Sequence, residues 1–75
     1  MQVDTELDAS GLHCPLPLLK AKKALSELAS GQLLRVIATD PGSWDDFAAF
    51  IEQSDHQLLE SRAEGERFVY LLRKG

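Results

Sequence analysis

The sequence predicts an α+β fold of βαβαββ order, a two-layer sandwich in which two helices cover one face of a four-stranded mixed sheet. Three features support this prediction: an opening segment that alternates apolar and polar residues, two internal segments with helical apolar spacing, and two closing strand-like segments joined by a turn. We expect residues 1–75 to form one domain, because a chain this short favours two layers. Right-handed crossovers place both helices on one side if the sheet is wound in one direction.

The first half of the chain contains one strand, one helix and a second strand. Residues 2–8 alternate in polarity, which predicts a strand with one buried face. A helix is expected from Pro15 to about Ser30, ending before Gly31. Its apolar face consists of Leu18, Ala21, Leu25, Leu28 and Ala29. Residues 33–39 are largely apolar and partly β-branched, which favours a central strand with both faces largely covered.

The second half begins with a turn at residues 40–42, where aspartate, proline and glycine follow one another. Ser43 is predicted to cap a helix that runs to about Ser54, with Asp46 in the capping-box position. The apolar face of this helix, Trp44, Phe47, Phe50 and Ile51, is expected to lie in the core. Residues 57–63 and 67–73 are predicted strands, joined by a tight hairpin turn at residues 64–66.

Composition and charge exclude several classes of protein. The 44% hydrophobic and 27% charged residues are typical of a folded domain, and the net charge of −4 argues against direct nucleic-acid binding. No apolar run reaches the roughly 18–20 residues of a membrane span, and residues 1–6 do not resemble a secretory signal. With one cysteine and two distant histidines we expect no disulfide, no metal and no cofactor, and a cytoplasmic location.

The candidate functional residue is Cys14, the only cysteine, which directly precedes Pro15. Proline is favoured at the first helical position, so the pattern predicts Cys14 as the N-cap and Pro15 and Pro17 as the first and third helical residues. The partial positive charge of a helix start favours an anion, which predicts a lowered pKa and a more nucleophilic thiolate. The alternative is a buried, inert cysteine that packs like a small apolar residue.

Three residues near Cys14 each leave two interpretations open. Leu16 lies about 160° round the helix from Leu18, so it is either an isolated exposed leucine or a contact for a partner. His13 either polarises the thiol or contacts a partner, or is a solvated loop histidine. Asp40 follows the second strand, at the sheet edge that also carries Cys14 if the first two strands are parallel. It either shapes the site or stabilises the turn.

Two other groups of residues are less informative. Lys20, Lys22 and Lys23 form a small basic patch on the first helix, which is either a solvated helix face or a surface that steers docking to an acidic partner. His56 lies at the start of the third strand, where a structural hydrogen bond is the favoured role.

The segment around Cys14 carries a family resemblance. Gly11-Leu12-His13-Cys14-Pro15-Leu16-Pro17, preceded by Leu7-Asp8, resembles the signature of the TusA/SirA family of small sulfur-carrier proteins. The resemblance continues through Gly31, Asp40-Pro41, Asp46-Phe47, Asp55-His56 and Tyr70-Leu71-Leu72-Arg73-Lys74-Gly75, and is closest to TusA. Some members carry a proline and a second cysteine where this chain has Ala48 and Ile51, so a two-cysteine mechanism is not available here.

The resemblance implies a βαβαββ two-layer sandwich and a sulfurtransferase-type function for Cys14. In this function Cys14 accepts a sulfane sulfur as a persulfide from a cysteine desulfurase and relays it to an acceptor protein. The implied use is 2-thiouridine formation in tRNA, in which this chain contacts enzymes and not the tRNA. Sulfur relay for molybdenum-cofactor maturation or sulfur oxidation stays open.

The chemistry of the residues agrees with a carrier. A persulfide is an anion at neutral pH and gains from the same helix-start field as a thiolate. A second cysteine would expel the sulfur as sulfide by closing a disulfide, so a single cysteine suits a carrier. Two alternatives stay open: a non-catalytic regulatory or interaction module in which the cysteine serves packing, and a redox-sensing thiol.

Overall fold

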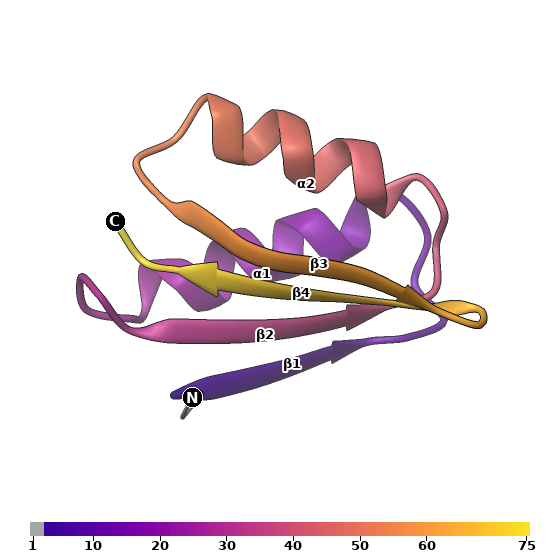
Figure 1. Cartoon of the computed structure of the whole chain (residues 1–75), viewed down its shortest axis with the longest axis horizontal. Helices are drawn as coiled ribbons and strands as arrows, with labels where there is room; N and C mark the ends of the chain where they lie inside the picture. Colours follow the sequence, from indigo (N-terminus) through magenta and orange to yellow (C-terminus); the bar gives the residue numbers. More distant parts are fainter. Residues whose placement is uncertain (1–2) are drawn as a thin grey trace.

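The computed structural model describes residues 3–75, and its elements follow the predicted βαβαββ order (Figure 1). They are β1 (Thr5–Ala9), α1 (Leu16–Ser26), β2 (Leu33–Ala38), α2 (Ser43–Glu52), β3 (Gln57–Glu64) and β4 (Arg67–Arg73). The strands lie in the order β1-β2-β4-β3. β1 and β2 run parallel, and β4 is antiparallel to both of its neighbours. The predicted four-stranded mixed sheet is therefore confirmed.

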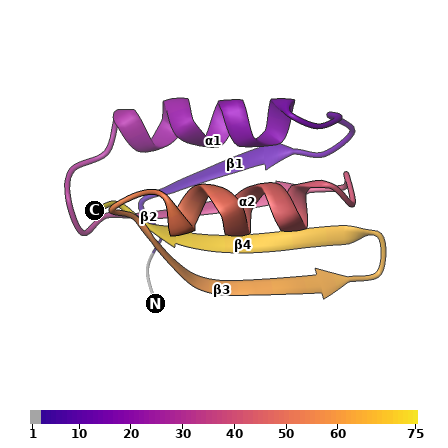
Figure 2. The ribbon, with the colours of Figure 1, turned by 90° about the horizontal axis from the view of Figure 1, so that it is seen from above.

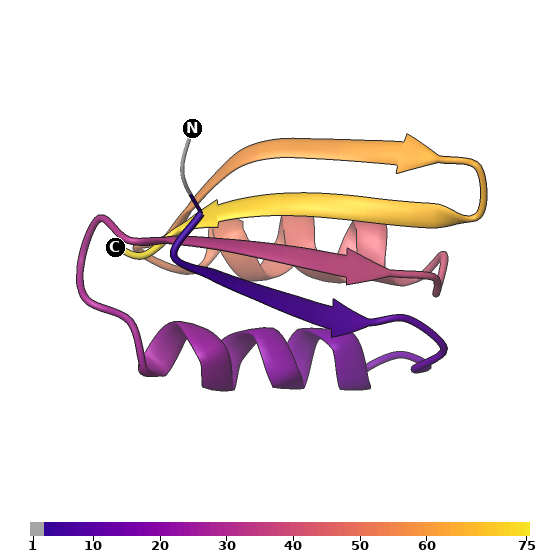
Figure 3. The same ribbon diagram turned by 90° about the horizontal axis from the view of Figure 1, so that it is seen from below.

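Both helices pack on one face of the sheet, as predicted. α2 lies in front of the strands in Figure 2 and behind them in Figure 3, where the molecule is seen from the opposite side. One hydrophobic cluster joins α1, α2 and the inner face of the sheet. Its buried residues are Ala9, Ala21, Leu25, Leu34, Val36, Ala38, Phe47, Tyr70 and Leu72. Burial of this apolar surface supplies the main favourable term in folding.

The two central strands differ in how they are covered. Along β2, Leu34, Val36 and Ala38 are buried while the intervening residues are half-buried. Both faces of β2 are therefore largely covered, as expected, and the face toward the two helices is the more deeply buried. β4 has the predicted bounds. Within β4, Val69 and Leu71 face away from the helices, yet they are only 6% and 9% exposed.

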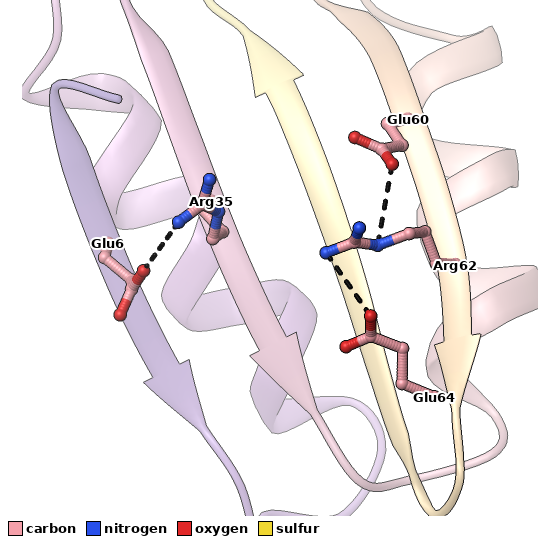
Figure 4. Close-up of polar contacts among 5 residues, drawn as sticks. All are labelled: Glu6, Arg35, Glu60, Arg62 and Glu64. Atoms are coloured by element: carbon pink, nitrogen blue, oxygen red, sulfur yellow. Dashed lines mark hydrogen bonds and ion pairs between the residues drawn. The ribbon is translucent and has the colours of Figure 1, made fainter. Parts of the chain in front are cut away.

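The open face of the sheet carries ion pairs (Figure 4). Arg35 Nη1 lies 3.2 Å from Glu6 Oε2, and Arg62 on β3 pairs with Glu60 and Glu64 at 3.5 and 3.6 Å. Figure 4 shows the Arg62 side chain reaching from β3 across β4, whose Val69 is its register partner. These pairs are about half exposed, so each contributes roughly 0–1 kcal/mol to stability.

The first helix is shorter than the predicted span of 15–30. It ends at Ser26 with Glu27 as the C-cap, and Ala29 is exposed instead of facing the core. The physical reason is that the following backbone bonds to the end of the chain: Gly31 N–H donates to Lys74 O, and Lys74 N–H donates to Gln32 O. Gly31 has a φ of +88°, which a residue with a side chain adopts at a cost.

The start of α2 also differs from the prediction. Ser43 is the first helical residue and Gly42 is the N-cap, which makes no side-chain capping bond. The Ser43 hydroxyl points inward, where it donates to the Asp40 carbonyl and shares a 2.7 Å hydrogen bond with Tyr70 Oη. The capping-box prediction is therefore wrong, because the Ser43 hydroxyl bonds to the buried Tyr70 hydroxyl instead of capping the helix. The helix ends at Glu52, two residues before Ser54.

The apolar face of α2 packs against the core as expected, except for Trp44, whose predicted core position is wrong because it lies at the exposed margin of the sheet against Phe68. The rings of Phe47 and Tyr70 lie 4.4 Å apart, and Phe50 and Ile51 are half-buried against the core. Trp44 is 40% exposed and packs on Phe68 at a centroid distance of 6.1 Å. Contacts of this kind between tilted rings add to the gain from buried area.

The remaining strand bounds differ little from the predictions. β1 runs from Thr5 to Ala9 instead of over residues 2–8, and its start at Gln2 lies outside the described residues. β3 extends one residue further than predicted, to Glu64, and Gly65 turns the hairpin with a φ of +63°. Within residues 3–75 no helix has both the length and the apolar character needed to cross a membrane.

We predict that Ser43→Ala lowers the free energy of unfolding by about 1–3 kcal/mol, because it leaves the buried Tyr70 hydroxyl without its partner. Tyr70→Phe should cost less, since the Ser43 hydroxyl keeps its bond to the Asp40 carbonyl. Urea denaturation of both variants and of the double variant measures the coupling. A Ser43→Ala protein as stable as the parent would show that the bond is unimportant.

Candidate functional site around Cys14

Cys14 lies in the segment that joins β1 to α1, and its thiol is free and exposed, as predicted. The helix begins one residue later than expected, at Leu16, with Pro15 as the N-cap and Pro17 in the first turn. Cys14 is therefore not the N-cap but the residue before it. The peptide bond between Cys14 and Pro15 is cis. The interpretation of a buried, packing cysteine is contradicted by the exposure of the thiol.

The helix start offers this thiol few free donors. Leu16 N–H donates to the His13 carbonyl at 2.8 Å, and Pro17 has no N–H. The field of a helix weakens within its first turn, and Cys14 lies outside that turn. The local backbone therefore stabilises a thiolate less than the sequence pattern suggested.

The nearest polar partner of the thiol comes from the other helix. Cys14 Sγ donates a hydrogen bond to Asp46 Oδ2 at 2.7 Å, and Asp46 lies in the first turn of α2. Because this carboxylate accepts the thiol proton and carries a negative charge, it raises the pKa of Cys14 above its ordinary value. Desolvation and the charge of Asp40 act in the same direction. The prediction of a lowered pKa is therefore wrong.

Asp40 both shapes this site and holds the turn before α2. Its carbonyl accepts bonds from the backbone and hydroxyl of Ser43, which stabilises the turn. Its Oδ2 is buried and has no hydrogen-bond partner within the described part of the chain. A Cβ on Gly42 would lie 2.9 Å from that oxygen and 3.6 Å from Cys14 Cβ. Gly42 thus leaves room for the Asp40 carboxylate beside the cysteine.

A shallow groove between α1 and α2 begins at this site. Its volume is about 460 Å³, and Asp46 forms part of both the groove and the thiol's surroundings. The other lining residues are Leu18, Lys22, Ala49, Phe50 and Gln53. The Lys22 ammonium lies 5.3 Å from the centre of the Phe50 ring, so this lysine packs against α2. All three lysines of the predicted patch, Lys20, Lys22 and Lys23, are exposed.

Of the other residues singled out in the sequence, Leu16 and His13 lie near Cys14 in the chain and His56 lies elsewhere. Leu16 is 45% exposed, as expected, and Leu19, which the pattern did not single out, is 50% exposed on the same helix. His13 is an exposed neighbour of Cys14. His56 belongs to the chain terminus instead, where its Nδ1 accepts a bond from Gly75 N–H at 2.9 Å, and its structural role is confirmed.

The arrangement suits thiol chemistry at an exposed sulfur more than chemistry in a pocket. Among residues 3–75 no group of three or more His, Cys, Asp or Glu side chains is placed to hold a metal ion. The sulfur is exposed, so another protein can reach it, and its partner Asp46 also lines a groove that is open to solvent.

Comparison with known proteins identifies the family. The family model for sulfurtransferase TusA matches residues 5–74. The chain belongs to the TusA family. It is 59% identical over 71 residues to the sulfur carrier protein TusA of Allochromatium vinosum, across 95% of this chain and 93% of that protein. It is also 45% identical to YrkI of Bacillus subtilis over the whole of both chains.

A solved structure supports the same assignment. A SirA-like protein from Desulfitobacterium hafniense has a TM-score of 0.82 to this chain at 27% identity, covering 95% of this chain and 97% of its own. The resemblance to the TusA/SirA family of sulfur carriers is therefore confirmed, together with the fold that it implied.

We predict that Leu16→Gln and Leu19→Gln each change the free energy of unfolding by no more than about 0.5 kcal/mol, because both side chains are exposed in this TusA-family fold. Glutamine matches leucine in helix propensity. Leu25→Ala on the same helix is the control and should cost about 2–5 kcal/mol, since Leu25 is 1% exposed. A large loss in either exposed variant, measured by urea denaturation, would show that these leucines serve the fold.

Proposed function

We propose that Cys14 is the catalytic residue of a sulfur carrier and holds a persulfide transiently. The observation that supports this most is the exposed thiol at the start of α1, within the Cys-Pro-x-Pro motif of a TusA-family chain. The protein needs no substrate pocket for this task, because the reacting sulfur must enter the active sites of other proteins. Residues 1–75 act in this proposal as one domain.

The donor in this proposal is a cysteine desulfurase that carries its own persulfide. Cys14 attacks the terminal sulfur of that persulfide, the donor's S–S bond breaks, and its electron pair stays on the donor's cysteine. The proton lost by Cys14 goes to that cysteine, so the products are a donor thiol and a Cys14 persulfide. An acceptor protein's thiolate then attacks the terminal sulfur and restores the Cys14 thiol.

The downstream use that we propose is 2-thiouridine formation in tRNA, carried out by other proteins in the cytoplasm. The formal charge of −4 supports contact with enzymes and not with the nucleic acid itself. Molybdenum-cofactor maturation and sulfur oxidation would use the same carrier chemistry with a different acceptor.

A redox-sensing role receives less support from the site. Oxidation of a cysteine follows its thiolate character and exposure. Cys14 is exposed, but the Asp46 carboxylate raises its pKa, which lowers the thiolate fraction at neutral pH. A packing role is excluded by the exposure of the thiol, so a regulatory or interaction module would have to work without it.

We predict that incubation with a cysteine desulfurase and free cysteine adds the mass of one sulfur, about 32 Da, to the protein. The added sulfur should be released by a reductant, because a persulfide is cleaved by thiol exchange. Intact-mass spectrometry measures the gain, and Cys14→Ser is the control that should show none. A parent protein that gains no sulfur under these conditions would overturn the proposed function.

A further inference from the structure

We propose that Asp46 holds the resting Cys14 thiol protonated and slow to react, so that efficient sulfur uptake requires a donor that breaks the contact between them. The 2.7 Å hydrogen bond from Cys14 Sγ to Asp46 Oδ2 carries this inference. It rests on the proposed function, because it concerns how the same sulfur is loaded. Asp46 contacts the reacting atom, and in this proposal it decides which sulfur sources Cys14 accepts.

The two carboxylates near the sulfur both favour its protonated form. Asp46 accepts the thiol proton from α2, and Asp40 adds a second negative charge from the turn before α2. The exposed His13 precedes the cysteine in sequence, and Lys22 on α1 packs against the Phe50 ring beside the same groove as Asp46. A hydrogen bond to a charged acceptor is about twice as strong as one between neutral groups, so it stabilises the thiol over the thiolate.

The backbone that carries Asp46 is held in place by contacts with the sheet. α2 is anchored to the sheet by Phe47 and by the Ser43–Tyr70 hydrogen bond, which fixes its first turn beside the β1–α1 segment. Gly42 has no side chain, which keeps the Asp40 carboxylate close to Cys14. Both carboxylates therefore come from the connection between β2 and β3, and the cysteine comes from the connection between β1 and β2.

Loading then begins with loss of the Cys14–Asp46 bond. Once a donor's group binds Asp46 or displaces it, the Cys14 proton passes to the donor cysteine as that cysteine leaves. The new bond joins Cys14 Sγ to the terminal sulfur, and the broken bond is the donor's S–S bond. Overall, one thiol and one persulfide exchange a sulfur atom, with no net oxidation and no further reactant. Small electrophiles that do not displace Asp46 react slowly with Cys14, because only a small fraction of its thiol is ionised.

The test compares Asp46→Asn with Asp45→Asn, a matched control that removes the same charge from the neighbouring exposed position in the first turn of α2. The rate of Cys14 alkylation by iodoacetamide is followed by intact mass between about pH 6 and pH 10, a range that spans ordinary thiol titration. We expect Asp46→Asn to react several-fold faster than the parent near neutral pH, on the order of threefold to tenfold, with a lower midpoint. Asp45→Asn should stay close to the parent.

Asp40→Asn is a second variant, expected to shift the midpoint in the same direction by less, because Asp40 acts on Cys14 through charge without bonding to the sulfur. Equal alkylation profiles for the parent, Asp46→Asn and Asp40→Asn would overturn the proposal. An equal acceleration by Asp45→Asn would also overturn the proposal, because it would show that any negative charge removed from this turn has the same effect.

A second measurement uses sulfur itself. Inorganic polysulfide transfers one sulfur to a cysteine thiolate and leaves one atom shorter, so uptake needs no enzyme. We expect Asp46→Asn to load faster than the parent from polysulfide. Equal loading rates would count against the proposal. If neither protein loads from polysulfide or from a desulfurase while the alkylation profiles differ as expected, the proposed function fails and the role of Asp46 in holding the thiol stands.

Discussion

The parallel pairing of β1 with β2 is the constraint on which the site depends. In this pairing Ala9 lies opposite Ala38, so both strands end at the same edge of the sheet. The segment after β1 carries Cys14 and the segment after β2 carries Asp40 and Gly42, and the two segments meet there. An antiparallel pair would place these segments at opposite ends of the molecule. The parallel topology therefore brings the two segments of the site together, and the individual side chains then determine its chemistry.

The order and kind of the elements could be predicted from the sequence because they follow from local patterns. Alternation along β1, the apolar run of β2 and helical spacing in α2 depend on neighbours a few residues apart, and the hairpin before β4 depends on Gly65. The ends of the helices could not be predicted in the same way. Gly31 N–H donates to the carbonyl of Lys74, and the Ser43 hydroxyl bonds to the Tyr70 hydroxyl. Such bonds join residues that are distant in sequence, and they override the local rules for caps.

The candidate site was predictable in its position but not in its chemistry. Sequence reasoning placed Cys14 at an exposed helix start, and it placed Asp40 at the same edge of the sheet. Asp46 was assigned to capping because it stands three residues after a serine, which is the usual signature of a capping box. One feature of the sequence could have linked Asp46 to Cys14: an acidic residue in the first turn of α2 lies at the sheet edge where β1 ends. Using it requires the parallel sheet to be taken as established.

The sign of the thiol's pKa shift follows from comparing two fields at one atom. The field of α1 comes from partial charges on backbone groups, one of which is already bonded to the His13 carbonyl, and it decays within a turn. The Asp46 carboxylate has a full charge and touches the sulfur directly, so it dominates. A persulfide changes this balance, because its charge lies on a terminal sulfur about 2 Å beyond Sγ. In our proposal the loaded sulfur leaves the carboxylate and faces solvent, so the same cysteine is slow to react when empty and anionic when loaded.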